Sequence, residues 1–182
     1  MKKISMARIA IVLTLISGLL LPGIIRAQED SKEKIMMDSK SAKADFEKGD
    51  PSMKNLFNKS YGYAIFPNVG KGAVGVGGAA GHGTVYEKGK EIGTAHMTQV
   101  SVGAQAGGEA YREVIFFESK DALDRFKHNK IEFSAQTAAI IVKSGAAADV
   151  NYRDGVVVFS QGKAGAMVDA SLGGQKFSYK AL

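Results

Sequence analysis

The chain has 182 residues, a formal net charge of +6 and no cysteine, which excludes disulfide frameworks and thiolate metal sites. The first 27 residues contain four basic and no acidic residues, so residues 28–182 carry 20 basic and 18 acidic residues, a net charge of +2. This balance argues against a nucleic-acid-binding protein, which requires a clustered basic face.

The N-terminal segment predicts a cleavable secretory signal peptide. Residues 1–27 have a positively charged start, an apolar middle and a small residue, Ala27, before a polar stretch. We expect cleavage near Ala27 and a periplasmic or secreted mature domain of residues 28–182, long enough for a real core. An uncleaved membrane anchor is the alternative, but Pro22 and Gly23 disfavour a spanning helix.

Two helices are predicted ahead of the first strand. Residues 28–48 carry apolar residues at helical spacing and are followed by Gly49. Asp50 as N-cap and Pro51 as first helical residue predict a second helix over residues 51–59. Whether residues 28–48 dock or form a mobile tail is left open. The apolar residues expected on the buried faces are Ile35, Ala42, Phe46, Met53, Leu56 and Phe57.

A glycine-rich region follows and predicts bent strands. Residues 62–108 contain 13 glycines in 47 residues, interleaved with Val, Ala and Thr at period two, which lets strands curl and backbones approach. We expect a compact strand over residues 63–66 that Pro67 ends, and a hairpin tip at residues 87–90. Two further strands are expected over residues 97–106 and 111–117.

The remaining chain predicts one inserted helix and late strands. Ser119 caps a helix over residues 119–129 that buries Ala122, Leu123 and Phe126. Residues 131–142 are compatible with a strand, but their pattern leaves the type of secondary structure open. Late strands are expected over residues 156–159, 166–172 and 177–179. The predicted fold class is α+β: a curled antiparallel glycine-rich sheet or barrel with N-terminal helices and one inserted helix.

Two motif matches lack the structural context that their chemistry needs. Residues 70–75 match the dinucleotide pattern G-x-G-x-x-G, but the glycines that follow forbid the required helix, so a curved strand is favoured. Ser160 and Lys163 match the acyl-transfer pattern S-x-x-K, but they lie where a strand meets a turn. We therefore expect no catalytic residues and no cofactor.

Histidines and carboxylates give no clear site either. His82, His96 and His128 stand alone in the sequence, so we expect no metal. Glu109, Glu113 and Asp169 lie in strand-like segments. A pair of these carboxylates serving as general acid and base is one interpretation. The other is that they occupy the outward-facing positions of strands, where charged residues are expected.

Four stretches, in order, resemble the SYLF family of lipid-binding domains, also known from yeast actin-patch proteins. They are residues 60–71 with Ala-Ile-Phe-Pro-Asn-Val-Gly-Lys, residues 75–83 with Gly-Gly-Ala-Ala-Gly-His-Gly, residues 102–108 with 114–117, and residues 159–165 with 170–173. The resemblance covers roughly residues 35–180. It implies binding of phosphoinositides or anionic phospholipids and, in fungal members, of actin.

The N-terminal helix departs from this pattern. Eukaryotic members use a basic amphipathic helix for lipid binding, whereas residues 28–50 hold five lysines and seven acidic residues, a net charge of −2. Such a segment is poorly suited to an anionic membrane.

The predicted lipid-binding residues are therefore cations elsewhere. The inserted helix and its exit supply one cluster, and two lysines beside glycine in the family-like motifs supply secondary candidates. The alternative interpretation is that basic residues at a helix C-terminus offset the helix dipole and that the two lysines are solvated. The candidates are Arg125, Lys127, His128 and Lys130, together with Lys71 and Lys163.

The function expected from these features is a non-enzymatic, exported SYLF domain that binds anionic phospholipid or a membrane surface of the cell envelope. The alternative is a structural or protein-interaction module with an envelope protein partner and no lipid ligand. A hydrolase that uses Ser160 and Lys163 is a third hypothesis. The oligomeric state is left open.

Overall fold

The computed structural model describes residues 21–74, 76–101, 110–130, 140–141, 145–148, 150–163 and 174–182. Residues 1–34 and 35–182 form two compact units, and the sheet lies within the second. Helix α2 (Leu21–Gly49) ends where the sequence predicts, but it begins before residue 28 because Pro22 is tolerated in a first helical turn. No helix among the described residues has the length and apolar content needed to cross a membrane.

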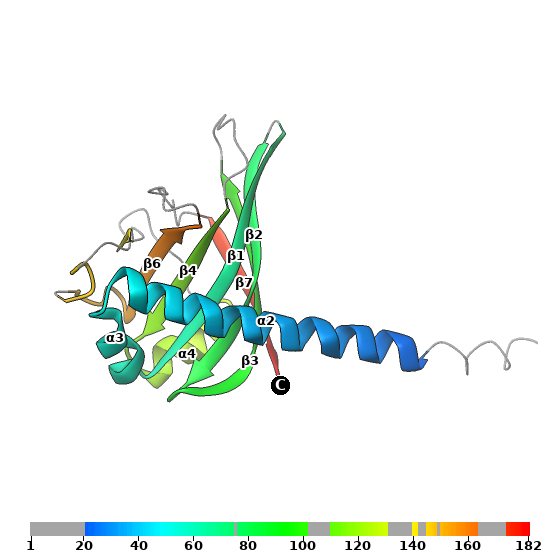
Figure 1. The fold of residues 1–182 in the computed structure, drawn as a ribbon, viewed down its shortest axis with the longest axis horizontal. Coiled ribbons are helices and arrows are strands. Elements are labelled where there is room, and N and C mark those ends of the chain that lie inside the picture. Colours follow the sequence, from blue (N-terminus) through cyan, green and yellow to red (C-terminus); the bar gives the residue numbers. More distant parts are fainter. Residues whose placement is uncertain are drawn as a thin grey trace, which may run out of the picture. The chain divides into compact units, whose positions relative to one another are not determined.

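A single sheet dominates the second unit (Figure 1), and in its described part the strand order is β5-β6-β4-β1-β2-β3-β7. Strand β5 pairs with β6 in parallel, and the other neighbours are antiparallel. The predicted α+β class with a curled antiparallel sheet is thus confirmed, and the sheet is open, not a barrel. The strands are β1 (Gly62–Val74), β2 (Val76–Glu87), β3 (Lys90–Ser101), β4 (Ala110–Phe117), β5 (Ile140–Ile141), β6 (Val156–Gly162) and β7 (Gln175–Ala181).

Strand β1 is longer than predicted, because Pro67 does not end it. The register of β1 shifts between Ile65 and Asn68 against β2, and between Phe66 and Val69 against β4. Pro67 lies in this bulge, where a missing N–H breaks no ladder hydrogen bond. The prediction of a strand ended by Pro67 was therefore wrong.

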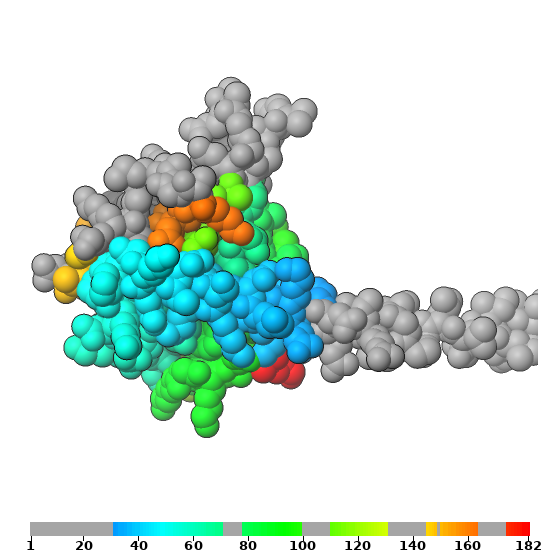
Figure 2. Space-filling view, in the orientation of Figure 1, coloured from blue at the N-terminus to red at the C-terminus, as the bar shows by residue number. Residues whose placement is uncertain are grey.

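Helices α2 and α3 (Met53–Lys59) cover one face of the sheet. Phe46 and Ala42 of α2 and Phe57 and Met53 of α3 are buried in one apolar cluster with side chains from β1, β4 and β6. Residues 35–49 of α2 are therefore docked. The lower half of the space-filling view shows this covering layer in blue and cyan (Figure 2).

The start of α3 differs from the prediction. The N-cap is Ser52, two residues after the predicted cap. The Asp50 carboxylate instead accepts hydrogen bonds from the Ser52 N–H at 3.0 Å and from the Ala147 N–H at 2.7 Å. The bond from Ser52 N–H is of the kind that a capping side chain accepts, but the helix begins at Met53, so Pro51 stays outside it.

The inserted helix α4 (Lys120–Lys127) fills the inside of the curled sheet. Ser119 caps it by accepting a hydrogen bond from Ala122 N–H, and Ala122, Leu123 and Phe126 are buried, as predicted. This helix packs against β1, β4 and β7. Since three strands separate β4 from β7 in the sheet order, the sheet must curl around α4 to place both beside it.

The other predicted elements are confirmed where the structure describes them. The hairpin tip is formed by Lys88 and Gly89, at φ 49° and 76°, and β3, β4, β6 and β7 match predicted strands with shifted ends. The predictions for residues 102–106, 131–139 and 166–172 lie outside the described residues.

Candidate functional site

A small polar pocket lies between α2 and the sheet, in the second unit. Its volume is about 100 Å³. In Figure 2 the surfaces of α2 and β6 adjoin, and the pocket is lined by residues of α2, β1 and β4 together with Lys163, which follows β6. We call it the α2 pocket, and its lining is Asp38, Ser41, Ala42, Asp45, Pro67, Asn68, Arg112 and Lys163. Since ligand pockets are usually several-fold larger, this one admits a single small polar group.

Arg112 forms the inner wall of the α2 pocket. Its guanidinium pairs with the Asp45 carboxylate and donates from Nη1 to Gln161 Oε1 at 3.2 Å. Its Nε is buried and has no hydrogen-bond acceptor among the described residues. An unsatisfied buried donor is costly, so the guanidinium that lines this pocket keeps a capacity to donate to an acceptor oxygen.

Lys163 lies at the rim of the same pocket. It follows β6, is exposed, and its ammonium group donates to Asn68 Oδ1. Asn68 in turn donates to Asp38 Oδ2 of α2 at 3.4 Å. The Lys163 ammonium group is thus a second cation at the α2 pocket, beside Arg112. Of the predicted lipid-binding residues, Lys163 lines this pocket.

The S-x-x-K pair is not assembled. Ser160 is fully buried and stands opposite Glu113 in the β4–β6 register, whereas Lys163 reaches Asn68 beside α2. Alternation along β6 places Ser160 on the inner face with Val158. The two side chains therefore serve different faces of the sheet.

The predicted cations of α4 are paired with local acidic groups. Arg125 binds the carboxylates of Asp121 at 3.1 Å and Asp154 at 2.8 Å. Lys127 binds Asp124 at 2.8 Å, and hydrogen bonds from Lys120 and then Lys127 lower the pKa of Asp124 to about 2. These charges satisfy one another on the helix surface.

The other three predicted residues lie apart. His128 Nδ1 is 2.7 Å from the Asp124 carbonyl oxygen, where it closes the helix end. Lys130 is exposed. Lys71 has Ala79 as register partner, and its side chain lies outside the described part. Since Arg125 binds Asp154 just before β6 and Lys163 follows its end, the six candidates do not form one cluster.

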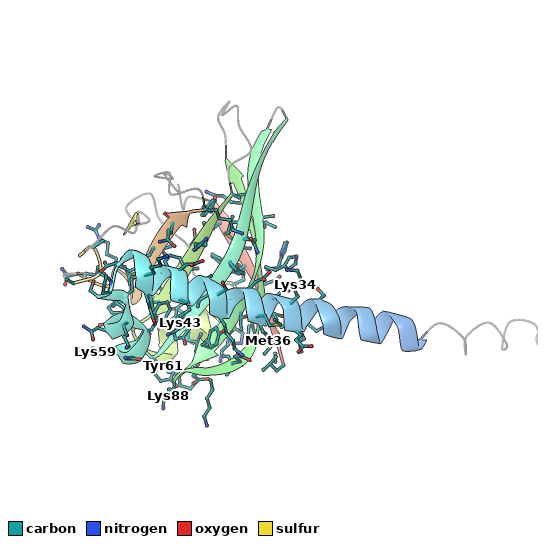
Figure 3. The ribbon with its side chains drawn as sticks, in the orientation of Figure 1. Lys34, Met36, Lys43, Lys59, Tyr61 and Lys88 are labelled. Atoms are coloured by element: carbon teal, nitrogen blue, oxygen red, sulfur yellow. The ribbon has the colours of Figure 1, made fainter. Side chains whose placement is uncertain are left out.

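A second basic surface, the lysine tip, was not among the predicted sites; it comprises Lys59 at the end of α3 and Lys88 and Lys90 at the β2–β3 turn. Lys88 N–H donates to the Tyr61 carbonyl oxygen at 2.9 Å, and its ammonium lies 5.2 Å from the centre of the Tyr61 ring. Figure 3 shows Lys59, Tyr61 and Lys88 at the same end of the sheet. No acidic partner of these lysines is found in the described part of the chain. The predicted hairpin at residues 87–90 was the signal that could have revealed this surface.

Glu113 points into the sheet, which corrects the expected outward position. It is fully buried and its Oε2 accepts a hydrogen bond from Gln175 Nε2 at 3.2 Å. Its neighbours Tyr111 and Ile115 face the same inner cluster, so alternation fixes its direction. Burial raises the pKa of Glu113 to about 7, although the hydrogen bond from Gln175 opposes the shift.

The histidines are not all isolated. His82 and His96 are register partners on β2 and β3, with ring centroids 4.4 Å apart. The prediction that they stand alone was wrong, because the separation of 14 residues spans one hairpin. Within the described residues no group of three or more histidine or acidic side chains could hold a metal ion.

Comparison with known proteins gives two matches. Residues 98–181 match the family model Ysc84, described as Las17-binding protein actin regulator. The chain is 31% identical over 137 residues to Beta cell expansion factor A of Aeromonas veronii, an alignment of 70% of this chain and 49% of that protein. The chain spans about half the length of this curated relative.

Proposed function

Because the chain belongs to the Ysc84 (SYLF) family, as its four motif stretches predicted, we propose that it binds phospholipid headgroups at a membrane surface. The observation that carries this proposal is the α2 pocket. There Arg112 has a buried donor without an acceptor, and Lys163 supplies a second cation at the rim. A phosphate oxygen is the acceptor that this pair suits.

The size of the α2 pocket limits the ligand. A hollow of about 100 Å³ has room for a headgroup phosphate, but not for an acyl chain or a nucleotide. Since Asp38 and Asp45 also line the pocket, binding depends on the balance of two cations and two carboxylates. We expect weak binding that falls as salt screens the charges.

We further propose that the protein acts without catalysis and after export. The separation of Ser160 from Lys163 supports a non-enzymatic role. The charged, apolar and small-residue pattern of residues 1–27 supports export. Mass analysis of protein recovered from the host envelope tests export, and a chain that still begins at Met1 would contradict cleavage near Ala27.

Vesicle flotation tests lipid binding and its location. We would compare phosphatidylcholine vesicles with vesicles that also contain phosphatidylglycerol, at low and high salt. Lys163→Gln removes the rim cation, and Lys180→Gln, an exposed lysine on β7, is its matched control. We expect binding to the anionic vesicles that Lys163→Gln weakens several-fold and Lys180→Gln does not.

Two further variants separate the alternative surfaces. Lys88→Gln with Lys90→Gln removes charge from the lysine tip, and the triple variant Arg125→Ala, Lys127→Ala and Lys130→Ala removes it from α4. If either set abolishes binding while Lys163→Gln has no effect, the α2 pocket is not the site. If the unaltered protein binds no vesicle, lipid binding is wrong, and the protein-interaction alternative becomes the hypothesis to test by crosslinking in the envelope.

A further inference from the structure

The β2–β3 hairpin presents a pair of imidazoles on the same face of the sheet as α2. His82 and His96 are direct register partners, and their rings lie 4.4 Å apart with an angle of 31° between the planes. Neighbouring side chains in register on this row are Asn68 of β1 and Ser178 of β7. The row is polar, and its two histidines are its strongest metal ligands.

The two rings differ in their surroundings. His82 is exposed, so its side chain can rotate, whereas His96 is half-buried. His96 Nδ1 is buried and has no hydrogen-bond partner among the described residues. None of the described side chains competes for this nitrogen, which reaches an incoming ion once the His96 ring rotates.

The surroundings of His82 favour its neutral form. Partial desolvation of the His82 ring, and secondarily the neighbouring His96, lowers the pKa of His82. A lowered pKa keeps the imidazole neutral at neutral pH, and the neutral form is the one that binds metals. The nearest charged groups by register are Lys176 and Lys180 of β7, opposite Thr98 and Thr94, and both are exposed and long enough to turn away.

We propose that His82 and His96 form a two-imidazole site for a divalent transition metal, with Zn²⁺ as the probe ion and water in the remaining positions. Imidazole nitrogen suits Zn²⁺, Cu²⁺ and Ni²⁺, whereas Ca²⁺ and Mg²⁺ require oxygen ligands. The hairpin backbone holds the second imidazole close to the first. Once one histidine has bound the ion, the second binds at a high effective concentration.

Calorimetric titration of the full chain with Zn²⁺, at micromolar protein, tests the site. We expect one Zn²⁺ per chain and no heat from Mg²⁺ under the same conditions. His82→Gln and His96→Gln should each weaken Zn²⁺ binding by a factor on the order of 100, because each leaves a single imidazole. The matched control is His128→Gln, which removes the solitary histidine at the end of α4 and should leave the affinity unchanged.

Amide NMR spectra locate the ion independently of affinity. Zn²⁺ should shift the signals of β2 and β3 around residues 82 and 96, and leave those of α4 in place. The proposal is overturned if the chain binds no Zn²⁺ at micromolar concentration, if His82→Gln binds as well as the unaltered chain, or if His128→Gln removes binding. Because His82 is exposed, the variant His82→Gln should fold normally. It therefore decides the outcome even if His96→Gln does not fold.

Discussion

At the residue scale, Glu113 is a carboxyl group that the fold holds where its charge is disfavoured. It is fully buried, and burial raises its pKa to about 7 from an ordinary 4.5. Gln175 donates one hydrogen bond, while Glu113 Oε1 and the nearby Ser160 Oγ have no partner among the described residues. Between these two pKa values the unfolded chain carries the charge and the folded chain carries the proton.

Stability should therefore fall as pH rises from about 4.5 to about 7, because the folded state binds more protons in this window. Glu113→Gln cannot ionise, so it should remove this slope and be more stable above pH 7 by up to roughly 3 kcal/mol. Urea unfolding across the window measures both effects. Glu118→Gln, at an exposed position just after β4, is the control, and equal slopes in all three proteins would contradict a buried, protonated Glu113.

Single residues also show where sequence reasoning reached its limit. Ser119 was identified as a cap because its partner, the Ala122 N–H, is three residues away. The partner of Arg125, Asp154, is 29 residues away and could not be identified from spacing. Charge that looks free in the sequence can thus be compensated in the fold, as it is for Arg125 of α4.

At the element scale, the glycines of β1 and β2 differ in what surrounds them. A Cβ at Gly83 would lie 2.3 Å from the Ile65 carbonyl oxygen, closer than any real contact. A Cβ at Gly70, also in a strand, would meet no atom within 4 Å. Glycine at residue 83 thus permits the close approach of β2 to β1, while at residue 70 it is not required by packing.

Gly83→Ala should destabilise the protein by about 1–3 kcal/mol, since the strands must separate to admit the methyl group. Gly70→Ala should be neutral or slightly stabilising, because alanine restricts the unfolded chain more than glycine does. Thermal unfolding of both variants checks this. A Gly83→Ala protein as stable as Gly70→Ala would mean that the two strands are not in close contact there.

The element boundaries show why local patterns were only partly sufficient. Proline usually ends a strand because it lacks an N–H donor. Pro67 lies in a bulge, where the strand needs no donor, so β1 continues past it. Whether a bulge forms depends on the neighbouring strands, which a local pattern does not show. The start of α3 also differs from the prediction, because Asp50 binds both the local Ser52 N–H and the Ala147 N–H, 97 residues away. Both errors arose where tertiary contacts override a local preference.

At the scale of the whole second unit, the sheet has two separate apolar clusters, one on each face. Phe57 lies in the cluster beneath α2 and α3, whereas Phe126 and Phe177 lie in the inner cluster around α4. The rings of Phe126 and Phe177 are 5.0 Å apart. The sheet thus stands between two groups of contacts that do not share side chains.

Double-mutant cycles can test this separation. Phe57→Leu and Phe177→Leu should each cost about 1 kcal/mol, and their effects should add to within about 0.5 kcal/mol. Phe126→Leu with Phe177→Leu should deviate from additivity, because these rings are in contact. Urea unfolding of the single and double variants gives the coupling energies. Strong coupling between residues 57 and 177 would contradict two independent clusters.

The α+β class, the two N-terminal helices and the inserted helix could be predicted because periodicity and caps are local signals, whereas the docking of the first helix was left open. The curl itself was predicted from the glycines, but long-range contacts across it were not, such as the hydrogen bond from Gln175 to Glu113, 62 residues apart. The α2 pocket was out of reach for the same reason. Lys163 was identified from a motif, but Arg112 and Asp45 meet across 67 residues of sequence.

The pairing of β7 with β3 also has a kinetic consequence. Strands β1, β2 and β3 form consecutive hairpins, whereas Thr98 of β3 pairs with Lys176 of β7 only after the intervening chain has closed into a loop. Such closure costs entropy that no local contact repays. During refolding, the amides of the β2–β3 hairpin should therefore gain protection from solvent exchange before those of β7, which would join last and complete the enclosure of α4.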